Sequence, residues 1–351
     1  MSDARRPHEP SLARTFQGAF EVGCAVGGTL PESLCETERA LLTRHFTGLT
    51  PENCMKPGPI QPAPGQYDFV QADALVRFAR DHQQRVVGHT LCWHQQSPDW
   101  FFESQADSRS ARERLREHIT TVVGRYRGQM RGWDVVNEAV ADQGEYLRDT
   151  PWLRALGEDY LLSAFQYAAE ADPAAELYYN DYNLERPDKR ERALRLLRTL
   201  LDRGARVDGV GIQGHWLLDQ VPFEGIERSI EAYAALGLKV MFTELDLDVI
   251  DRPDCSADLA VQREYTLTDD IYRAGCPTEV LERQASQFAE LFRLFAGQKA
   301  VTRVTFWGLN DGRSWLNNWP GKRTNHPLLF DRECRPKPAF WRVVELIQSR
   351  A

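Results

Sequence analysis

Short runs of apolar residues alternate with longer amphipathic segments along most of the chain. The short runs have the length of buried strands, and roughly 20 to 60 residues separate each from the next, which leaves room for a helix every time. We expect eight strands, at residues 20–26, 46–49, 86–89, 132–136, 177–180, 209–213, 239–243 and 304–307.

Between these runs the apolar residues recur with the 3.6-residue period of a helix. The segments with this spacing are 71–80, 160–169, 189–203, 223–236, 280–295 and 338–347. Eight strands that alternate with helices in a chain of 351 residues predict one α/β domain, a single (β/α)8 TIM barrel. An open doubly wound sheet is the alternative, but residues 22–28, where the first predicted strand ends, do not fit the Gly-rich pattern that binds dinucleotides or phosphates.

The domain organisation follows from the ends of this pattern. Residues 1–15 begin as a polar, Pro-containing stretch and are predicted to form a flexible N-terminal tail, with the barrel occupying 16–351. The first ten residues contain no apolar run after their charges, so we expect no secretory signal and a cytoplasmic location, provided that Met1 is the native start.

The composition limits the classes of partner and cofactor that we expect the protein to bind. The net charge is -8 and no basic run stands out, which argues against nucleic acid or an anionic membrane as a partner. The seven cysteines show no metal-binding spacing, so we predict packed, reduced thiols and neither a metal nor another cofactor; Cys255 and Cys276 share one loop region and are the pair to check for a disulfide. Nine Trp and eleven Tyr suit either sugar faces or an aromatic core.

Polar and aromatic residues gather where the predicted strands end, the edge at which TIM barrels carry their active sites. Among them, Glu138 and Glu244 follow two widely separated strands of the same shape. Carboxyl groups brought together in this way are what carboxylate-pair chemistry requires. Each residue also has a plainer explanation, such as an ion-paired glutamate, a buried histidine or a tryptophan that seals the barrel.

Several motifs in one order resemble glycoside hydrolase family 10, whose typical members are endo-β-1,4-xylanases. The likeness runs from about Phe16 to the end of the chain. Its motifs are Thr50-Pro51-Glu52-Asn53-x-Met55-Lys56, Gly88-His89-Thr90-Leu91-x-Trp93-His94, Trp133-Asp134-Val135-Val136-Asn137-Glu138, Ile212-Gln213-Gly214-His215, Thr243-Glu244-Leu245-Asp246 and Thr305-Phe306-Trp307-Gly308.

The resemblance implies a retaining mechanism with Glu138 as general acid/base and Glu244 as nucleophile, and Asp246 behind His215 to orient its ring. It implies xylan or xylo-oligosaccharides as substrate. Tyr182 is expected to stack on the leaving-group side, and Trp315 with Gln96 to form a roof that selects xylose. The implied substrate contacts are Glu52, Asn53, Lys56, His89, Trp93, Gln96, Asn137, Tyr182, Gln213, His215, Trp307 and Trp315.

Two positions depart from the family pattern. Cys54 and Pro57 stand where a polar residue and a Trp are expected, which puts the sugar contacts around Glu52 and Lys56 in doubt. The alternatives are another retaining β-glycan hydrolase, an exo-acting enzyme similar to a xylosidase, or a carbohydrate-binding protein without catalysis. The sequence does not indicate an oligomeric state.

Overall fold

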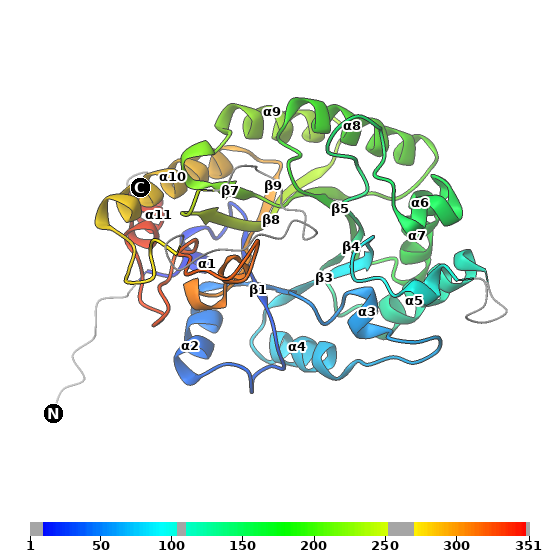
Figure 1. Cartoon of the computed structure of the whole chain (residues 1–351), viewed down its shortest axis with the longest axis horizontal. Coiled ribbons are helices and arrows are strands. Elements are labelled where there is room, and N and C mark those ends of the chain that lie inside the picture. The colour runs from blue at the N-terminus through cyan, green and yellow to red at the C-terminus, as the bar shows by residue number, and fades with distance from the viewer. Residues whose placement is uncertain (1–9, 104–109, 252–269, 349–351) are drawn as a thin grey trace.

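The chain folds into a closed parallel barrel in a computed structural model that describes residues 10–103, 110–251 and 270–348. Figure 1 shows the strands forming a ring with helices around its outside. Each strand pairs in parallel with the next, and the pairing of β6 with β8 closes the ring. The ring consists of β1 (Glu21–Val26), β2 (Gly48–Pro51), β3 (Arg85–Cys92), β4 (Gly132–Asn137), β5 (Glu176–Asp181), β6 (Gly209–Ile212), β8 (Lys239–Asp248) and β9 (Val301–Phe306).

The predicted TIM barrel is therefore confirmed, and each expected strand overlaps one of these eight. The largest difference is in β8, which was expected to end at residue 243 and continues to Asp248. An additional short strand, β7 (His215–Leu217), pairs with this extension. Gly214 separates β6 from β7 with φ +84, a left-handed backbone conformation that glycine adopts without strain.

The outer helices bury one apolar face each against the ring. In α4 (Val70–Asp81), for example, Leu75, Phe78 and Ala79 are buried, while the charged positions face outward. The other helices are α2 (Glu36–His45), α3 (Pro57–Ile60), α5 (Ala111–Arg125), α6 (Pro151–Leu156), α7 (Asp159–Ala171), α8 (Pro187–Asp202), α9 (Phe223–Ala234), α10 (Thr278–Gly297) and α11 (Pro338–Gln348). The six predicted helices correspond to α4, α7, α8, α9, α10 and α11, whereas α2, α3, α5 and α6 were not predicted.

The N-terminal segment requires one correction. Residues 1–15 were expected to form a flexible tail, but α1 (Leu12–Thr15) is a short helix that contacts α2 and α11. Leu12 is fully buried and the Ser11 hydroxyl donates to the carbonyl of Arg44 over 2.6 Å. The burial of one leucine in an otherwise polar stretch is enough to dock this turn, and a composition argument overlooks it.

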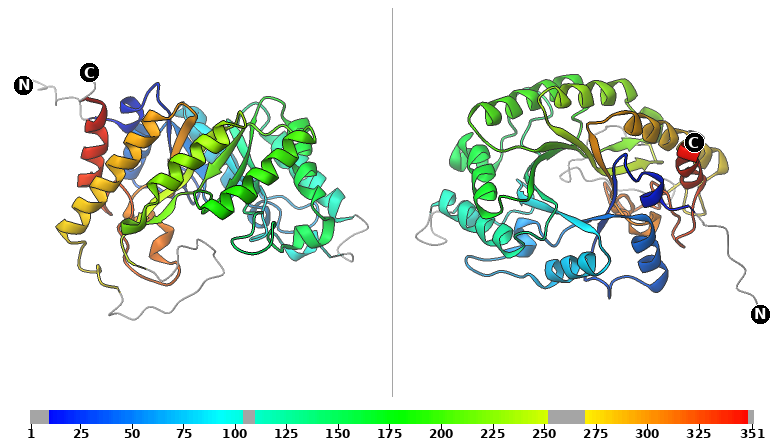
Figure 2. Two further views of the ribbon diagram at one scale, coloured as in Figure 1. Left: turned by 90° about the horizontal axis from the view of Figure 1, so that it is seen from above. Right: turned by 180° about the vertical axis from the view of Figure 1, so that it is seen from behind.

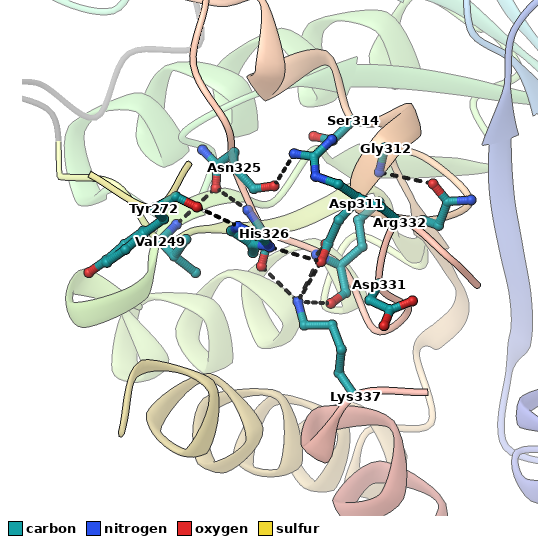
Figure 3. Close-up of polar contacts among 12 residues, drawn as sticks. Val249, Tyr272, Asp311, Gly312, Ser314, Asn325, His326, Asp331, Arg332 and Lys337 are labelled. Carbon is teal, nitrogen blue, oxygen red and sulfur yellow. Dashed lines mark hydrogen bonds and ion pairs between the residues drawn. The ribbon is translucent and has the colours of Figure 1, made fainter. Parts of the chain in front are cut away.

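A long segment after β9 folds over the end of the barrel where the strands finish. It contains the 3-10 turns η3 (Asp311–Arg313) and η4 (Trp315–Asn317). Figure 3 shows Asp311 and Lys337 at its base, where the Lys337 ammonium lies 3.1 Å from the Asp311 carboxylate and donates to the carbonyl of His326 over 2.8 Å. These buried contacts fasten the two ends of the segment to each other.

Cys24 and Cys92 are buried, as packed thiols should be, and Cys54 is half-buried. Cys255 lies outside the described residues, so its proposed pairing with Cys276 is not addressed by the structure. Within the described ranges, no helix combines the length and the apolar character that a bilayer span needs.

Candidate active site

A cavity lies at the C-terminal ends of the strands, and most of the predicted site residues line it. They come from the C-terminal parts of six barrel strands, β2, β3, β4, β6, β8 and β9, or from the segments that follow these strands, which is why their positions in sequence are so far apart. The lining residues are Glu52, Asn53, Lys56, His89, Trp93, Gln96, Asn137, Glu138, Gln213, His215, Glu244, Trp307 and Trp315.

Glu138 is the first residue after β4 and has φ 56, a left-handed conformation that is uncommon for a residue with a side chain. Its carboxyl group accepts hydrogen bonds from Gln213 Nε2 over 2.9 Å and from Trp93 Nε1 over 2.8 Å. Burial raises the pKa of Glu138, and these two donors only partly oppose that effect. The group is therefore suited to carry a proton when the cavity is empty.

Glu244 on β8 has a different environment. One carboxylate oxygen lies 3.2 Å from His215 Nε2, and the other accepts from Asn180 Nδ2 over 2.9 Å. Burial would raise its pKa, but His215, His89 and Asn180 together lower it below the ordinary value. The two buried carboxyl groups of the cavity thus have pKa values shifted in opposite directions, which is how one site holds an acid and an ionised group at the same pH.

His215 connects Glu244 to Asp246. Because β7 pairs with the extension of β8 in register, His215 stands opposite Asp246, and its Nδ1 lies 3.0 Å from the Asp246 carboxylate. Burial alone would lower the pKa of His215, but the two carboxylates raise it to about 9. The imidazolium that results is a charged donor for Glu244.

His89 and Lys56 form further contacts in the wall of the cavity. His89 Nδ1 lies 2.9 Å from the buried carboxylate of Asp134, so its Nε2 is the ring nitrogen left for a ligand. At another part of the wall, Lys56 donates to Asn53 over 3.1 Å and its ammonium lies 4.9 Å from the centre of the Trp93 ring. Burial lowers the pKa of Lys56.

Tyr182 is the predicted contact that the structure places elsewhere. The residue is 1% exposed, and its ring lies beneath the Lys189 ammonium at 3.8 Å rather than at the cavity surface. Its hydroxyl donates to Asp142 over 2.6 Å and accepts from Arg148 over 2.6 Å. A side chain enclosed by three charged groups cannot present its face to a sugar, so the stacking role is wrong for this conformation.

Two polar residues at the site were absent from the predicted set. Asn180 at the end of β5 donates to both Asn137 Oδ1 and Glu244 Oε1, each over 2.9 Å, and so links two strands of the site. Arg148 donates from Nε to the backbone carbonyl of Glu138 over 3.1 Å. Asn180 stands directly at a predicted strand end and could have been included on that signal, whereas Arg148 lies in a loop without a recognisable motif.

A parallel barrel with two buried carboxyl groups of opposite pKa shift in one cavity has the architecture of a barrel glycoside hydrolase. The chain belongs to glycosyl hydrolase family 10, because the profile with that description matches residues 11–346. The resemblance seen in the sequence motifs is therefore confirmed.

Relatives and solved structures agree with this assignment over nearly the whole chain. Endo-1,4-beta-xylanase B of Paenibacillus barcinonensis is 42% identical over 343 residues, which are 95% of this chain and 98% of that protein. An endo-1,4-beta-xylanase of Geobacillus stearothermophilus is 42% identical over 347 residues, 96% of this chain and 98% of the relative. A solved GH10 endoxylanase from a sugarcane soil metagenome superposes with a TM-score of 0.91 at 37% identity, covering 96% of this chain and 100% of that structure.

Proposed function

We propose that the protein is a retaining endo-1,4-β-xylanase that cleaves internal bonds of xylan or xylo-oligosaccharides. The observation that carries the proposal is the pair Glu138 and Glu244, buried in one cavity with pKa values displaced in opposite directions. Retaining glycosidases need one carboxyl group that is protonated and one that is ionised at the same pH. Family membership and the names of the relatives support the substrate class.

In the first step, Glu244 attacks the anomeric carbon while Glu138 donates its proton to the departing sugar oxygen. The bond between the anomeric carbon and that oxygen breaks, and an ester to Glu244 forms. Asn180 and His215 hold the attacking carboxylate from its two oxygens, so little reorientation is needed at the moment of attack.

In the second step, Glu138, now ionised, accepts a proton from water as the water oxygen displaces Glu244 from the anomeric carbon. Esterification has removed the negative charge of Glu244, one of the influences that raise the pKa of Glu138, so the proton is lost more readily at this stage. Two inversions at one carbon give net retention of configuration.

Asn137 supports the same chemistry. Its Oδ1 accepts from Asn180, which leaves the amide nitrogen, 3.3 Å from Glu138 Oε1, turned toward the cavity that it lines. A donor at this position suits the sugar 2-hydroxyl, a contact that strengthens in an oxocarbenium-like transition state.

Time-resolved product analysis on xylohexaose, with proton NMR of the anomer released first, tests the proposal. We expect xylobiose and xylotriose early in the reaction and the β-anomer before mutarotation. Release of xylose alone from one end would establish exo action, and the α-anomer first would overturn retention. The Glu244→Ala variant, folded but inactive on an aryl β-xylobioside, is the control that ties turnover to this cavity.

A further inference from the structure

Strand β8 carries three carboxylates on one face, at the alternate positions 244, 246 and 248. Glu244 is 5% exposed, Asp246 is fully buried and Asp248 is 1% exposed. Because successive side chains of a strand point to opposite faces, the three groups form a row. The first two belong to the site already described, while the third lies beyond it and forms its side-chain hydrogen bonds with Arg323 and Asn325.

Asp248 forms a fully buried ion pair with Arg323. The guanidinium Nη2 donates to Asp248 Oδ2 over 2.6 Å, and both side chains are 0% exposed. Asn325 completes the arrangement, since its Nδ2 donates to Asp248 Oδ1 over 2.7 Å. Figure 3 shows Asn325 beside Val249, whose backbone N–H donates to the Asn325 side chain. A buried ion pair contributes little net stability compared with apolar residues, so its geometric consequence is the more informative property.

That consequence concerns the η4 turn. Arg323 donates from Nε to the carbonyl of Leu316 over 3.1 Å, and its backbone N–H donates to the carbonyl of Asn317 over 2.9 Å. Leu316 and Asn317 are the two residues that follow Trp315. The guanidinium therefore joins β8 directly to the main chain that carries Trp315.

Trp315 itself is held at a second point. Its indole N–H donates to Asp246 Oδ2 over 2.8 Å, and its ring stacks on Trp319 with the ring centres 4.6 Å apart. The indole thus rests on one carboxylate of the row, while its backbone is fixed through Arg323 to the next. Two attachments to the same strand set the height of the indole above the cavity that holds Glu244.

We propose that Arg323, held by Asp248, is a specificity-determining positioning residue that fixes Trp315 as a rigid roof over the cleavage subsite. The proposal rests on the xylanase function proposed above. Xylose lacks the C5 hydroxymethyl group of glucose, and a roof that cannot rise excludes the larger sugar by contact. Without the guanidinium bonds to Asp248 and Leu316, the roof keeps the indole bond to Asp246 and the stacking on Trp319 but loses this link to β8. It then yields more easily, so discrimination between the two sugars falls.

The experiment compares kcat/KM for an aryl β-xylobioside with kcat/KM for the matched aryl β-cellobioside. Arg323→Lys keeps the positive charge opposite Asp248. The lysine side chain is shorter and has no planar guanidinium group, so it cannot also reach the carbonyl of Leu316. The double variant Asp248→Asn with Arg323→Met removes both charges, so that neither is left buried without its partner. Arg190→Met is the matched control, because Arg190 is a buried arginine that donates to the carbonyl of Glu185, away from the roof.

We expect the ratio of kcat/KM for the xylobioside to kcat/KM for the cellobioside to fall about threefold to tenfold in Arg323→Lys and in the double variant. This is part of the discrimination that a pocket typically achieves against a substrate with one extra carbon group. The ratio should stay at the wild-type value in Arg190→Met. Thermal unfolding identifies which variants are folded before their ratios are compared.

An unchanged ratio in folded Arg323→Lys or in the folded double variant overturns the inference, as does an equal fall in Arg190→Met, which would reflect general softening of the barrel. A different result bears on the proposed function instead. If the wild-type protein turns over neither glycoside, or prefers the cellobioside, the xylanase assignment fails before Arg323 is considered.

Discussion

The side-chain amide of Asn180 donates to Glu244 Oε1 over 2.9 Å, from a different strand of the barrel. The same nitrogen donates to Asn137 Oδ1, and the carbonyl oxygen of the amide accepts from the Thr243 hydroxyl over 2.6 Å. One buried amide therefore orients Glu244, the proposed nucleophile, and Asn137, the residue next to the proposed acid/base Glu138. Its three bonds leave it no alternative rotamer with equal hydrogen bonding.

Replacement of Asn180 by alanine should lower kcat/KM about tenfold to a hundredfold, because a hydrogen bond to a charged group typically contributes about 1.5–3 kcal/mol. Loss of the donor also raises the pKa of Glu244, so the acidic limb of the pH profile should move to higher pH. Steady-state kinetics across pH measures both effects. Thr243→Val is the control, since it leaves the Asn180 amide donors in place; an equal loss in that variant would argue against a specific role for the amide.

The pH dependence of kcat/KM should be bell-shaped with assignable limbs. Glu244 has its pKa lowered by His215, His89 and Asn180 against the effect of burial, so activity rises as pH increases through a value below 4.5. Burial raises the pKa of Glu138, so activity falls as pH increases through a value above 4.5. Glu138→Gln, assayed with an activated aryl leaving group, should lose the alkaline limb and keep the acidic one. An alkaline limb that persists in this variant would assign it to another group.

Arg148 should affect catalysis through the backbone of Glu138. Its Nε donates to the Glu138 carbonyl over 3.1 Å, and its Nη2 donates to Asp142 and to the Tyr182 hydroxyl. We expect Arg148→Met to reduce kcat about tenfold with little change in KM, because the carboxyl group is misplaced while most sugar contacts remain. Arg154→Met, which removes only an exposed ion pair with Asp149, should behave as wild type. A rise in KM with unchanged kcat would place Arg148 in ground-state binding instead.

Glu38 should make the free energy of unfolding depend on pH in the acid range. A hydrogen bond from Arg313, assisted by the Cys35 N–H, lowers the pKa of Glu38 to about 2 although burial opposes the shift. A depressed folded-state pKa stabilises the protein fully above the unfolded value near 4.5, and this stability is lost as pH falls from there toward 2.

Glu38→Gln should therefore lower the free energy of unfolding by about 1–2 kcal/mol at pH 7, after allowance for solvent around the partly exposed Arg313, and by much less near pH 2. Urea unfolding at the two pH values measures the difference. Glu36→Gln, an exposed position on the same helical turn, is the comparison. A deficit that is equal at both pH values would show that packing rather than charge is responsible.

The strand and helix order of the barrel was predictable because period-2 and period-3.6 patterns are local properties of the chain. The extension of β8 was not, since its polar residues 244, 246 and 248 read as a loop. They lie in a strand because each carboxylate has a hydrogen-bond partner there: His215 binds Glu244 and Asp246, Trp315 binds Asp246, and Arg323 binds Asp248. These partners come from distant parts of the sequence.

For the site, too, the features set by local sequence could be predicted, and those set by distant partners could not. Residues at strand ends could be placed because parallel strands deliver them to one edge of the barrel. The direction of a side chain just past the strand could not, and Tyr182 turns inward because Asp142, Arg148 and Lys189 close over it. Arg148 could not be predicted because its place depends on a loop that folds back on the chain just after β4, where the Arg148 N–H donates to the carbonyl of Ala139 over 2.8 Å.

The contact between α1 and α11 has a practical consequence for handling the enzyme. Helix α1 leads into the start of β1, and α11 contacts α1, so α1 and the C-terminal end of α11 lie at the end of the barrel where the strands begin (Figure 2). The cavity opens at the other end, where the strands finish. A tether or solid support attached near α1 or near the C-terminal end of α11 therefore lies on the side of the barrel opposite the cavity that receives the polysaccharide.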